Sequence, residues 1–293
     1  MDYGICLPVM TEGASREGIE AAAEVAERVG WSTVWTTDHV LVDHSPPAAD
    51  YRRIFDPIVT LAYLAARHER VKLGTSVIVV PMRNAVILAK ELATLDELSG
   101  GRVIAGVGVG WSRAEFENLG VGDRFHVRGA YLEETIQLWR HLWSGQTTPF
   151  RGRFHVIEDF AFAPLPPQGA ALPIWIGGGR SEAAIRRAGK LGDGYHATAS
   201  SPSTFGERLP ILRSAAEAAG RPLPGLSTRV RVAFDAPEGP FYALRGTPEA
   251  MAADIRQFES LGLVHLALAF PAPDPTGIVA SAERFIREVA PLV

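Results

Sequence analysis

Residues 172–196 read LPIWIGGGRSEAAIRRAGKLGDGYH, and this order of side chains predicts a strand, a glycine turn, a helix and a second strand. Residues 173–176 form a short apolar run that suits a buried strand. Ser181 is a good N-cap for the helix, and Gly192 stands where a left-handed cap is expected after its last residue. The segment is therefore predicted to be a β-α-β unit.

The turn of this unit contains three consecutive glycines, Gly177, Gly178 and Gly179, followed by Arg180. Glycine lets the backbone adopt dihedral angles that a Cβ forbids, and it lets a ligand approach the main chain. Free N–H groups, the positive end of the helix and the Arg180 guanidinium would then meet at one place, which suits a phosphate or another anion. A tight turn with a surface arginine explains the same residues, so both interpretations stay open.

The rest of the chain repeats the alternation of strand and helix. The predicted strands are residues 3–7, 33–37, 71–80, 102–109, 173–176, 194–198, 228–234 and 263–270. Many of them are apolar on both faces, which predicts an α/β fold with a parallel sheet closed into a (β/α)8 TIM barrel. No low-complexity linker divides the chain, so we expect a single domain over residues 1–293. Its insertions are expected at about residues 40–55, 111–127, 145–170 and 235–246, and the third of these is predicted to contain a hairpin.

The composition argues against several classes of partner. The chain is 47% hydrophobic and has a net charge of −4 without a run of Lys and Arg, so neither nucleic acid nor a membrane surface is expected as a partner. The N-terminus has no basic segment followed by an apolar one, and no run approaches ~18 apolar residues, so a cytoplasmic protein is expected. The single cysteine, Cys6, is expected in the core, and the eight histidines lack metal-ligand spacing, so no metal is expected.

Catalytic residues of such a barrel are expected at the carboxyl ends of its strands. Asp38 and His39 follow the second strand, and an acid beside an imidazole can orient a proton donor or bind the heteroatoms of a ligand ring. Gly106 and Gly108 alternate along the fourth strand, which leaves one face without side chains, as it would for a flat ring. For the first pair a structural role is the alternative, and for the glycines it is relief of crowding at the rim of the barrel.

Five segments together resemble the bacterial luciferase-like superfamily, and in particular its branch that uses the deazaflavin coenzyme F420. They are TTDH (36–39), LGTSVI (73–78), GRVIAGVGVGW (101–111) followed by Glu115 and Phe116, PIWIGG (173–178) and LGDGY (191–195). The resemblance implies a TIM barrel with insertions, a small-molecule substrate, a homodimer and hydride transfer to or from F420. An FMN-dependent monooxygenase is the alternative activity, and a binding protein that holds the cofactor without turnover is the alternative class.

The resemblance also implies roles for individual residues. It gives Asp38 and His39 catalytic roles near the edge of the cofactor ring, and it predicts a cis peptide bond between Ser76 and Val77 behind the ring. The remaining cofactor contacts that it implies are Gly106, Val107 and Gly108 near the ring and ribityl chain, and Gly177, Gly178, Gly179 and Arg180 at the phosphate and its tail. One sugar-phosphate dehydrogenase of the family has Gly-Glu where this chain has Gly110 and Trp111. The substrate of that enzyme and its glutamate acid are therefore not expected here.

Overall fold

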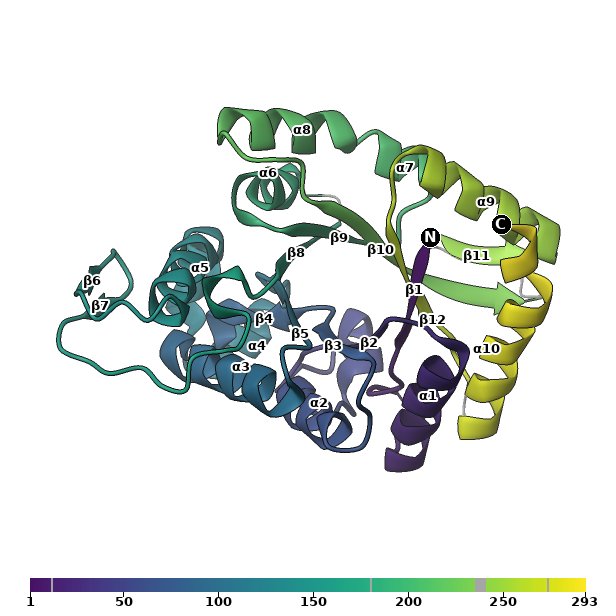
Figure 1. Cartoon of the computed structure of the whole chain (residues 1–293), viewed down its shortest axis with the longest axis horizontal. Helices are drawn as coiled ribbons and strands as arrows, with labels where there is room; N and C mark the ends of the chain where they lie inside the picture. Colours follow the sequence, from purple (N-terminus) through teal and green to yellow (C-terminus); the bar gives the residue numbers. More distant parts are fainter. Residues whose placement is uncertain (12, 180, 235–240, 273) are drawn as a thin grey trace.

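Eight parallel strands form a closed barrel in the computed structural model, which describes all residues except 12, 180, 235–240 and 273 (Figure 1). Around the barrel the strands follow the order β1 (Asp2–Cys6), β2 (Thr33–Thr36), β3 (Lys72–Thr75), β5 (Val103–Gly108), β8 (Ile174–Gly178), β9 (Gly194–Thr198), β10 (Gly225–Phe234) and β12 (His265–Ala269). The ring closes because β12 pairs with β1, and β10 pairs with both β9 and β12. The predicted TIM barrel is confirmed.

Helices surround the barrel and follow its strands (Figure 1). Their bounds are α1 (Arg16–Val29), α2 (Pro57–Ala65), α3 (Ala85–Ser99), α4 (Arg113–Asn118), α5 (Arg128–Trp143), α6 (Glu182–Leu191), α7 (Pro202–Gly206), α8 (Leu209–Ala218), α9 (Pro248–Ser260) and α10 (Pro275–Glu288). Helix α1 shows why such segments start and end where they do. Ser15 accepts a hydrogen bond from the Gly18 amide at its start, and Gly30 adopts a left-handed conformation with φ of 78° at its end. No helix in the described part of the chain has the length and apolarity needed to cross a membrane.

Two hydrophobic layers hold the barrel together. The larger one packs the outward side chains of the strands against the helices. The smaller one lies inside the barrel and contains Trp35, Ile104 and Ala267, with Cys6 and Trp175 packed against it. Trp35 donates a hydrogen bond from Nε1 to Nε2 of His265 at 3.0 Å, so the indole N–H of this buried tryptophan is paired.

The insertions carry short elements of their own. The 40–55 insertion contains a 3₁₀ helix, η1 (Pro46–Tyr51), and the 111–127 insertion contains α4 and a second 3₁₀ helix, η3 (Gly122–His126). The predicted hairpin is present as β6 (Phe150–Arg151) and β7 (Val156–Ile157), which project away from the barrel (Figure 1). The last insertion lies partly outside the described residues, and its described part contains β11 (Ala243–Gly246), which pairs with β10.

Two local predictions were wrong, and a third was correct only in the position of the residue. Gly192 has φ −81° and ψ 150°, so it ends α6 in an extended conformation rather than a left-handed one. Its Cβ would lie 2.9 Å from the Ala188 carbonyl oxygen, so a lack of space accounts for the glycine. Ser181 takes the predicted N-cap position of α6, but its side chain makes no capping hydrogen bond. Gly177 and Gly178 continue strand β8 and do not adopt a positive φ, so the turn comes later than expected.

Candidate functional site

The predicted site residues gather at the carboxyl ends of four neighbouring strands. Asp38 and His39 follow β2, and Ser76 and Val77 separate β3 from β4 (Ile78–Val79). Gly106 to Gly108 end β5, and Gly177 and Gly178 end β8. Because β2, β3, β5 and β8 are consecutive in the barrel, these residues share one side of its mouth. We call this region the bulge side, after the interruption at Ser76 and Val77 between β3 and β4.

The third strand was predicted as one run over residues 71–80, but it is interrupted. The Ser76–Val77 peptide bond is cis, as predicted, and β4 then pairs with β5. Ser76 Oγ lies 2.9 Å from Nε2 of His196, and Nδ1 of His196 lies 2.9 Å from Oγ of Ser227. Burial, together with the nearby His265 and Arg229, lowers the pKa of His196 to about 3. A neutral imidazole therefore holds the Ser76 hydroxyl inside the barrel.

The glycines on this side make room for the interruption. A Cβ on Gly106 would lie 1.6 Å from the carbonyl oxygen of Thr75, and a Cβ on Gly108 would lie 2.5 Å from Cγ2 of Val77. A Cβ on Gly177 would lie 2.7 Å from Cγ1 of the same valine. Relief of crowding, the alternative that the sequence left open for Gly106 and Gly108, thus accounts for both of them, and it accounts for Gly177 as well. Their contact with a cofactor ring stays a prediction.

Val107 lies between two of these glycines and faces the other way. Its side chain is fully buried in the layer between the barrel and the helices. Only its backbone can therefore contribute to the predicted cofactor site. Along the same strand Ile104 belongs to the interior layer, as the alternation of a strand requires.

Asp38 is held by a buried ion pair with Arg83. Arg83 donates to it from Nη2 to Oδ1 at 2.7 Å and from Nε to Oδ2 at 3.1 Å, and the Val79 amide donates to Oδ2 at 2.9 Å. Arg83 also reaches Oδ2 of Asp56, the N-cap residue of α2, at 2.9 Å. Burial alone would lower the pKa of Arg83, but its hydrogen bonds and charge interactions with Asp38 and Asp56 raise the pKa overall. This geometry favours a positioning role for Asp38, and its catalytic role stays a prediction.

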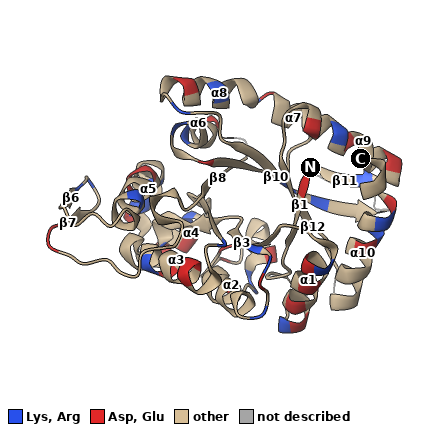
Figure 2. Cartoon of the chain, viewed as in Figure 1, with Lys and Arg blue, Asp and Glu red and all other residues tan. Residues whose placement is uncertain are grey.

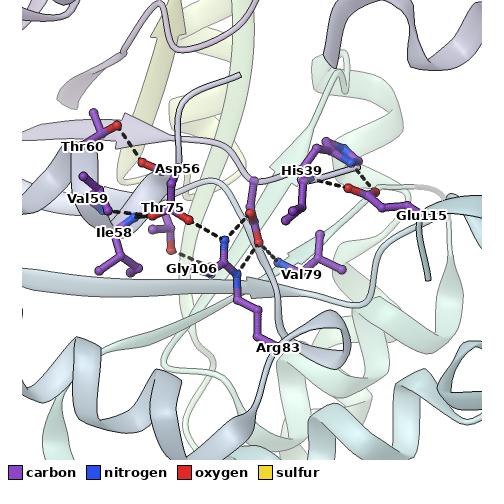
Figure 3. Close-up of polar contacts among 12 residues, drawn as sticks. His39, Asp56, Ile58, Val59, Thr60, Thr75, Val79, Arg83, Gly106 and Glu115 are labelled. Atoms are coloured by element: carbon purple, nitrogen blue, oxygen red, sulfur yellow. Dashed lines mark hydrogen bonds and ion pairs between the residues drawn. The ribbon is translucent and has the colours of Figure 1, made fainter. Parts of the chain in front are cut away.

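His39 faces a second carboxylate, that of Glu115 (Figure 3). Its Nδ1 lies 2.7 Å from Oε2 of Glu115, and the Val40 amide donates to Oε1 of the same glutamate at 2.6 Å. The ring of His39 lies 4.2 Å from that of Tyr51 and 5.7 Å from that of Trp111, measured between centroids. Nε2 of His39 has no hydrogen-bond partner among the described residues. The imidazole is thus fixed through one nitrogen, and the other is left for a ligand.

Glu115 follows the glycine-rich segment 101–111 of the family resemblance, but no role is predicted for it from the sequence. Ser112 and Glu115 match the S-x-x-E pattern of a helix start, which is a sufficient local explanation for an acid at this position. The structure confirms only half of that pattern. Ser112 Oγ accepts from the Glu115 amide at 3.3 Å, while the Glu115 carboxylate turns to His39. Glu115 is 1% exposed, and this burial is the signal that the sequence could not supply.

The predicted phosphate site lies at the end of β8. Arg180 is outside the described residues, so its part in the site stays a prediction. An added Cβ on Gly179 would meet Oγ1 of Thr198 at 3.6 Å, which is an ordinary contact distance, so Gly179 is not required by crowding. Within the described ranges, no three His, Cys, Asp or Glu side chains are grouped as a metal site would require.

The other side of the mouth is hollow. A cavity of about 700 Å³ lies at the ends of β1, β10 and β12 and is lined in part by Cys6, Arg229 and Phe270. Arg229 links it to the bulge side, since its Nη1 donates to the Ser76 carbonyl oxygen at 3.2 Å. The volume is within the range of ~300–1,000 Å³ that is usual for small-molecule and cofactor sites.

TIM-barrel enzymes have a parallel eight-stranded barrel with their active-site residues at the carboxyl ends of the strands, and this protein has the same architecture. The sequence profile of the luciferase-like monooxygenase family matches residues 1–238, and the chain belongs to this family. It is 30% identical over 287 residues to the F420-dependent glucose-6-phosphate dehydrogenase of Kineococcus radiotolerans. This alignment covers 89% of this chain and 81% of the relative.

Solved structures repeat the fold with both kinds of cofactor. An F420-dependent secondary alcohol dehydrogenase in complex with an F420–acetone adduct superposes with a TM-score of 0.80 at 21% identity, over 100% of this chain and 98% of that one. The oxygenating constituent of 3,6-diketocamphane monooxygenase from Pseudomonas putida, in complex with FMN, has a TM-score of 0.81 at 17% identity. This match covers 99% of this chain and 98% of the monooxygenase chain. At these identities the likeness establishes the fold and leaves the choice of cofactor to the sequence relatives and to experiment.

Proposed function

We propose that this protein is an oxidoreductase that transfers a hydride between coenzyme F420 and a small organic substrate. The proposal draws on the curated relative of 30% identity, which is named F420-dependent, and on the motifs of the sequence. When bound, F420 supplies a ring that accepts or donates two electrons as a hydride. The protein then has to position the substrate and to exchange a proton with it.

The residues at the mouth fit such a group. Ser76 and Val77 at the interruption of the third strand, with Gly106 and Gly108 beside them, would face the ring. Gly177, Gly178, Gly179 and Arg180 would hold the phosphate and its tail. The cavity of about 700 Å³ adjoins this region through Arg229, so there is room for a substrate next to the ring.

The free nitrogen of His39 is the observation that carries the proposal. An ionised Glu115 carboxylate can only accept a hydrogen bond, so with Oε2 2.7 Å from Nδ1 the neutral imidazole carries its proton on Nδ1 and keeps the lone pair on Nε2, directed away from that carboxylate. When a C–OH group loses a hydride from carbon, its hydroxyl proton must also leave, and His39 Nε2 is the acceptor that the geometry supports. In the reverse direction, the protonated imidazole returns that proton to the carbonyl oxygen.

The test is a titration of the purified protein with F420 and, separately, with FMN, followed by absorbance and fluorescence. We expect F420 to bind more tightly and to change its absorbance when alcohols, unsaturated carbonyls or sugar phosphates are added. Tighter binding of FMN with oxygen consumption would support the monooxygenase instead. Binding of F420 without turnover in that screen would support a cofactor-binding protein. The proposal also includes a homodimer, which light scattering of the purified chain would test.

A further inference from the structure

Four arginines line the cavity on the other side of the barrel mouth. Arg229 and Arg231 come from β10, and Arg52 and Arg53 follow the 3₁₀ helix η1. Asp50 is the single acidic residue among the described lining residues. The chain as a whole carries a net charge of −4, and Figure 2 shows acidic and basic residues interspersed along the outer helices α1, α8, α9 and α10. A local excess of positive charge inside a hollow therefore differs from the rest of this protein.

The arginines use only part of their hydrogen-bonding capacity in contacts with the described residues. Among the described residues, Arg53 has no side-chain hydrogen bond or ion pair. Arg231 reaches Asp50 only at 3.6 Å, and both side chains are more than half exposed. An exposed ion pair of this kind contributes little to stability, so Arg231 can turn to a ligand. Arg52 donates from Nη2 to the His44 carbonyl at 2.7 Å, and its remaining donors are not used in that bond.

The cavity lies next to the proposed reaction centre. Asp50 lines it, while Tyr51, the next residue of η1, packs against the ring of His39 with centroids 4.2 Å apart. At the cavity floor, Arg229 donates to the Ser76 carbonyl oxygen at the interruption of the third strand. A molecule in the cavity would therefore have one end near the proposed ring site and the other among the arginines.

The remaining wall is mostly apolar. Leu7, Pro8 and Met10 line it from the loop after β1, and Phe270 and Pro271 line it from the loop after β12. Guanidinium groups bind carboxylates and phosphates through paired N–H donors, and an apolar wall suits the carbon skeleton that carries such a group. The lining thus matches an amphiphilic anion better than a neutral alcohol or a cation.

We propose that the cavity binds the oxyanion of an organic acid, a carboxylate or a phosphate ester, and that Arg53 and Arg231 are its main contacts. This inference rests on the proposed hydride transfer, and it identifies the substrate as a small anionic molecule. Arg229 lies deeper and shapes the floor. Asp50 competes with the ligand for Arg231 and so limits its affinity.

Calorimetric titration of the cofactor-free protein at constant low ionic strength tests this assignment. The probes are inorganic phosphate, propionate and, as the neutral control, propionamide. We expect saturable binding of at least one anion and none of propionamide. Arg53→Ala and Arg231→Ala should each weaken the binding of that anion by about tenfold or more. Stronger binding of phosphate or of propionate tells which oxyanion the site prefers.

Two further variants make the test sharper. Asp50→Asn should tighten anion binding several-fold, because it removes the carboxylate that faces Arg231. Arg151→Ala, on the hairpin strand β6, removes one charge from an exposed ion pair away from the cavity and should leave binding unchanged (Figure 1). Phosphate bound at the predicted site at the end of β8 would survive in the Arg53→Ala/Arg231→Ala double variant, so the cavity accounts only for the anion binding that this variant loses. If the double variant loses no binding of either anion, if neither anion binds the parent, or if propionamide binds equally well, the proposal is overturned. Since no F420 is present, this outcome is independent of the cofactor titration, and either proposal can fail alone.

Discussion

The charged side chains on the two sides of the barrel mouth differ in how far they are buried and how closely they are paired. On the bulge side Asp38 is 1% exposed, and both of its oxygens are bound by Arg83 and by a backbone amide. On the side of the cavity, Arg231 is more than half exposed and reaches its carboxylate only at 3.6 Å. Polar groups that are buried and fully paired fix geometry, whereas exposed and loosely paired groups are available to a ligand. The bulge side is therefore suited to hold reacting groups in place, and the arginine-lined cavity to bind.

The largest effect that this comparison predicts is on stability. Arg83→Ala leaves the buried Asp38 with one backbone donor, so the free energy of unfolding should fall by about 3–5 kcal/mol. Arg231→Ala removes a long, exposed pair and should change the free energy of unfolding by less than about 0.5 kcal/mol. Urea unfolding followed by circular dichroism measures both. If the two variants lose similar stability, the contrast between the two sides does not hold.

The second prediction concerns rates on the bulge side. His39→Ala should lower turnover by about 10²-fold or more, because it removes the proposed proton acceptor. Glu115→Gln keeps the shape of the side chain but removes the charge that fixes Nδ1, so a loss of about tenfold is expected. Since Glu115 acts through His39, the double variant should be no slower than His39→Ala alone.

Stability has to be measured alongside these rates. In His39→Ala, Glu115 stays buried with the Val40 amide as its remaining partner, so a loss of about 1–3 kcal/mol in the free energy of unfolding is expected. The rates are therefore compared at a temperature where every variant is folded. Losses of rate that add up in the double variant would mean that Glu115 acts independently of the histidine.

The fold could be predicted from the sequence because its signals are local. Each barrel strand is a short apolar run, and residues such as Ser15 and Gly30 mark the two ends of a helix. The third strand was predicted as continuous because its β-branched residues extend through the interruption at Ser76 and Val77. In that region the resemblance to a family, rather than the pattern of residues, predicted the cis bond.

The partners within the site could not be predicted, since they are distant in sequence. Glu115 is 76 residues from His39, and Arg83 is 45 residues from Asp38. A single sequence carries no signal that joins such positions. The reason for the glycines could not be predicted either, because the atoms that crowd them come from other parts of the chain. The sequence records only that Gly106 lacks a side chain, and the structure shows that the space is taken by the Thr75 carbonyl.

The third prediction concerns a pH dependence of stability that comes from the barrel interior. His196 is fully buried between the hydroxyls of Ser76 and Ser227, and Trp35 stacks on its ring with centroids 4.7 Å apart. Its pKa is lowered from 6.5 to about 3 by burial and by the charges of His265 and Arg229. In the unfolded chain this imidazole takes up a proton below about pH 6.5, while in the folded protein it stays neutral down to about pH 3.

Its contribution to stability is therefore fully present above about pH 6.5 and falls as the pH decreases toward 3, by up to about 1.4 kcal/mol per pH unit. The free energy of unfolding of His196→Gln should decrease less steeply than that of the parent between pH 6.5 and 4.5, because this variant has no imidazole to protonate at that position. Ser227→Ala keeps the imidazole and loses one hydrogen bond, so it should be less stable but keep the steep dependence. Parallel curves for the parent and His196→Gln would mean that the buried imidazole is not what couples the barrel interior to pH.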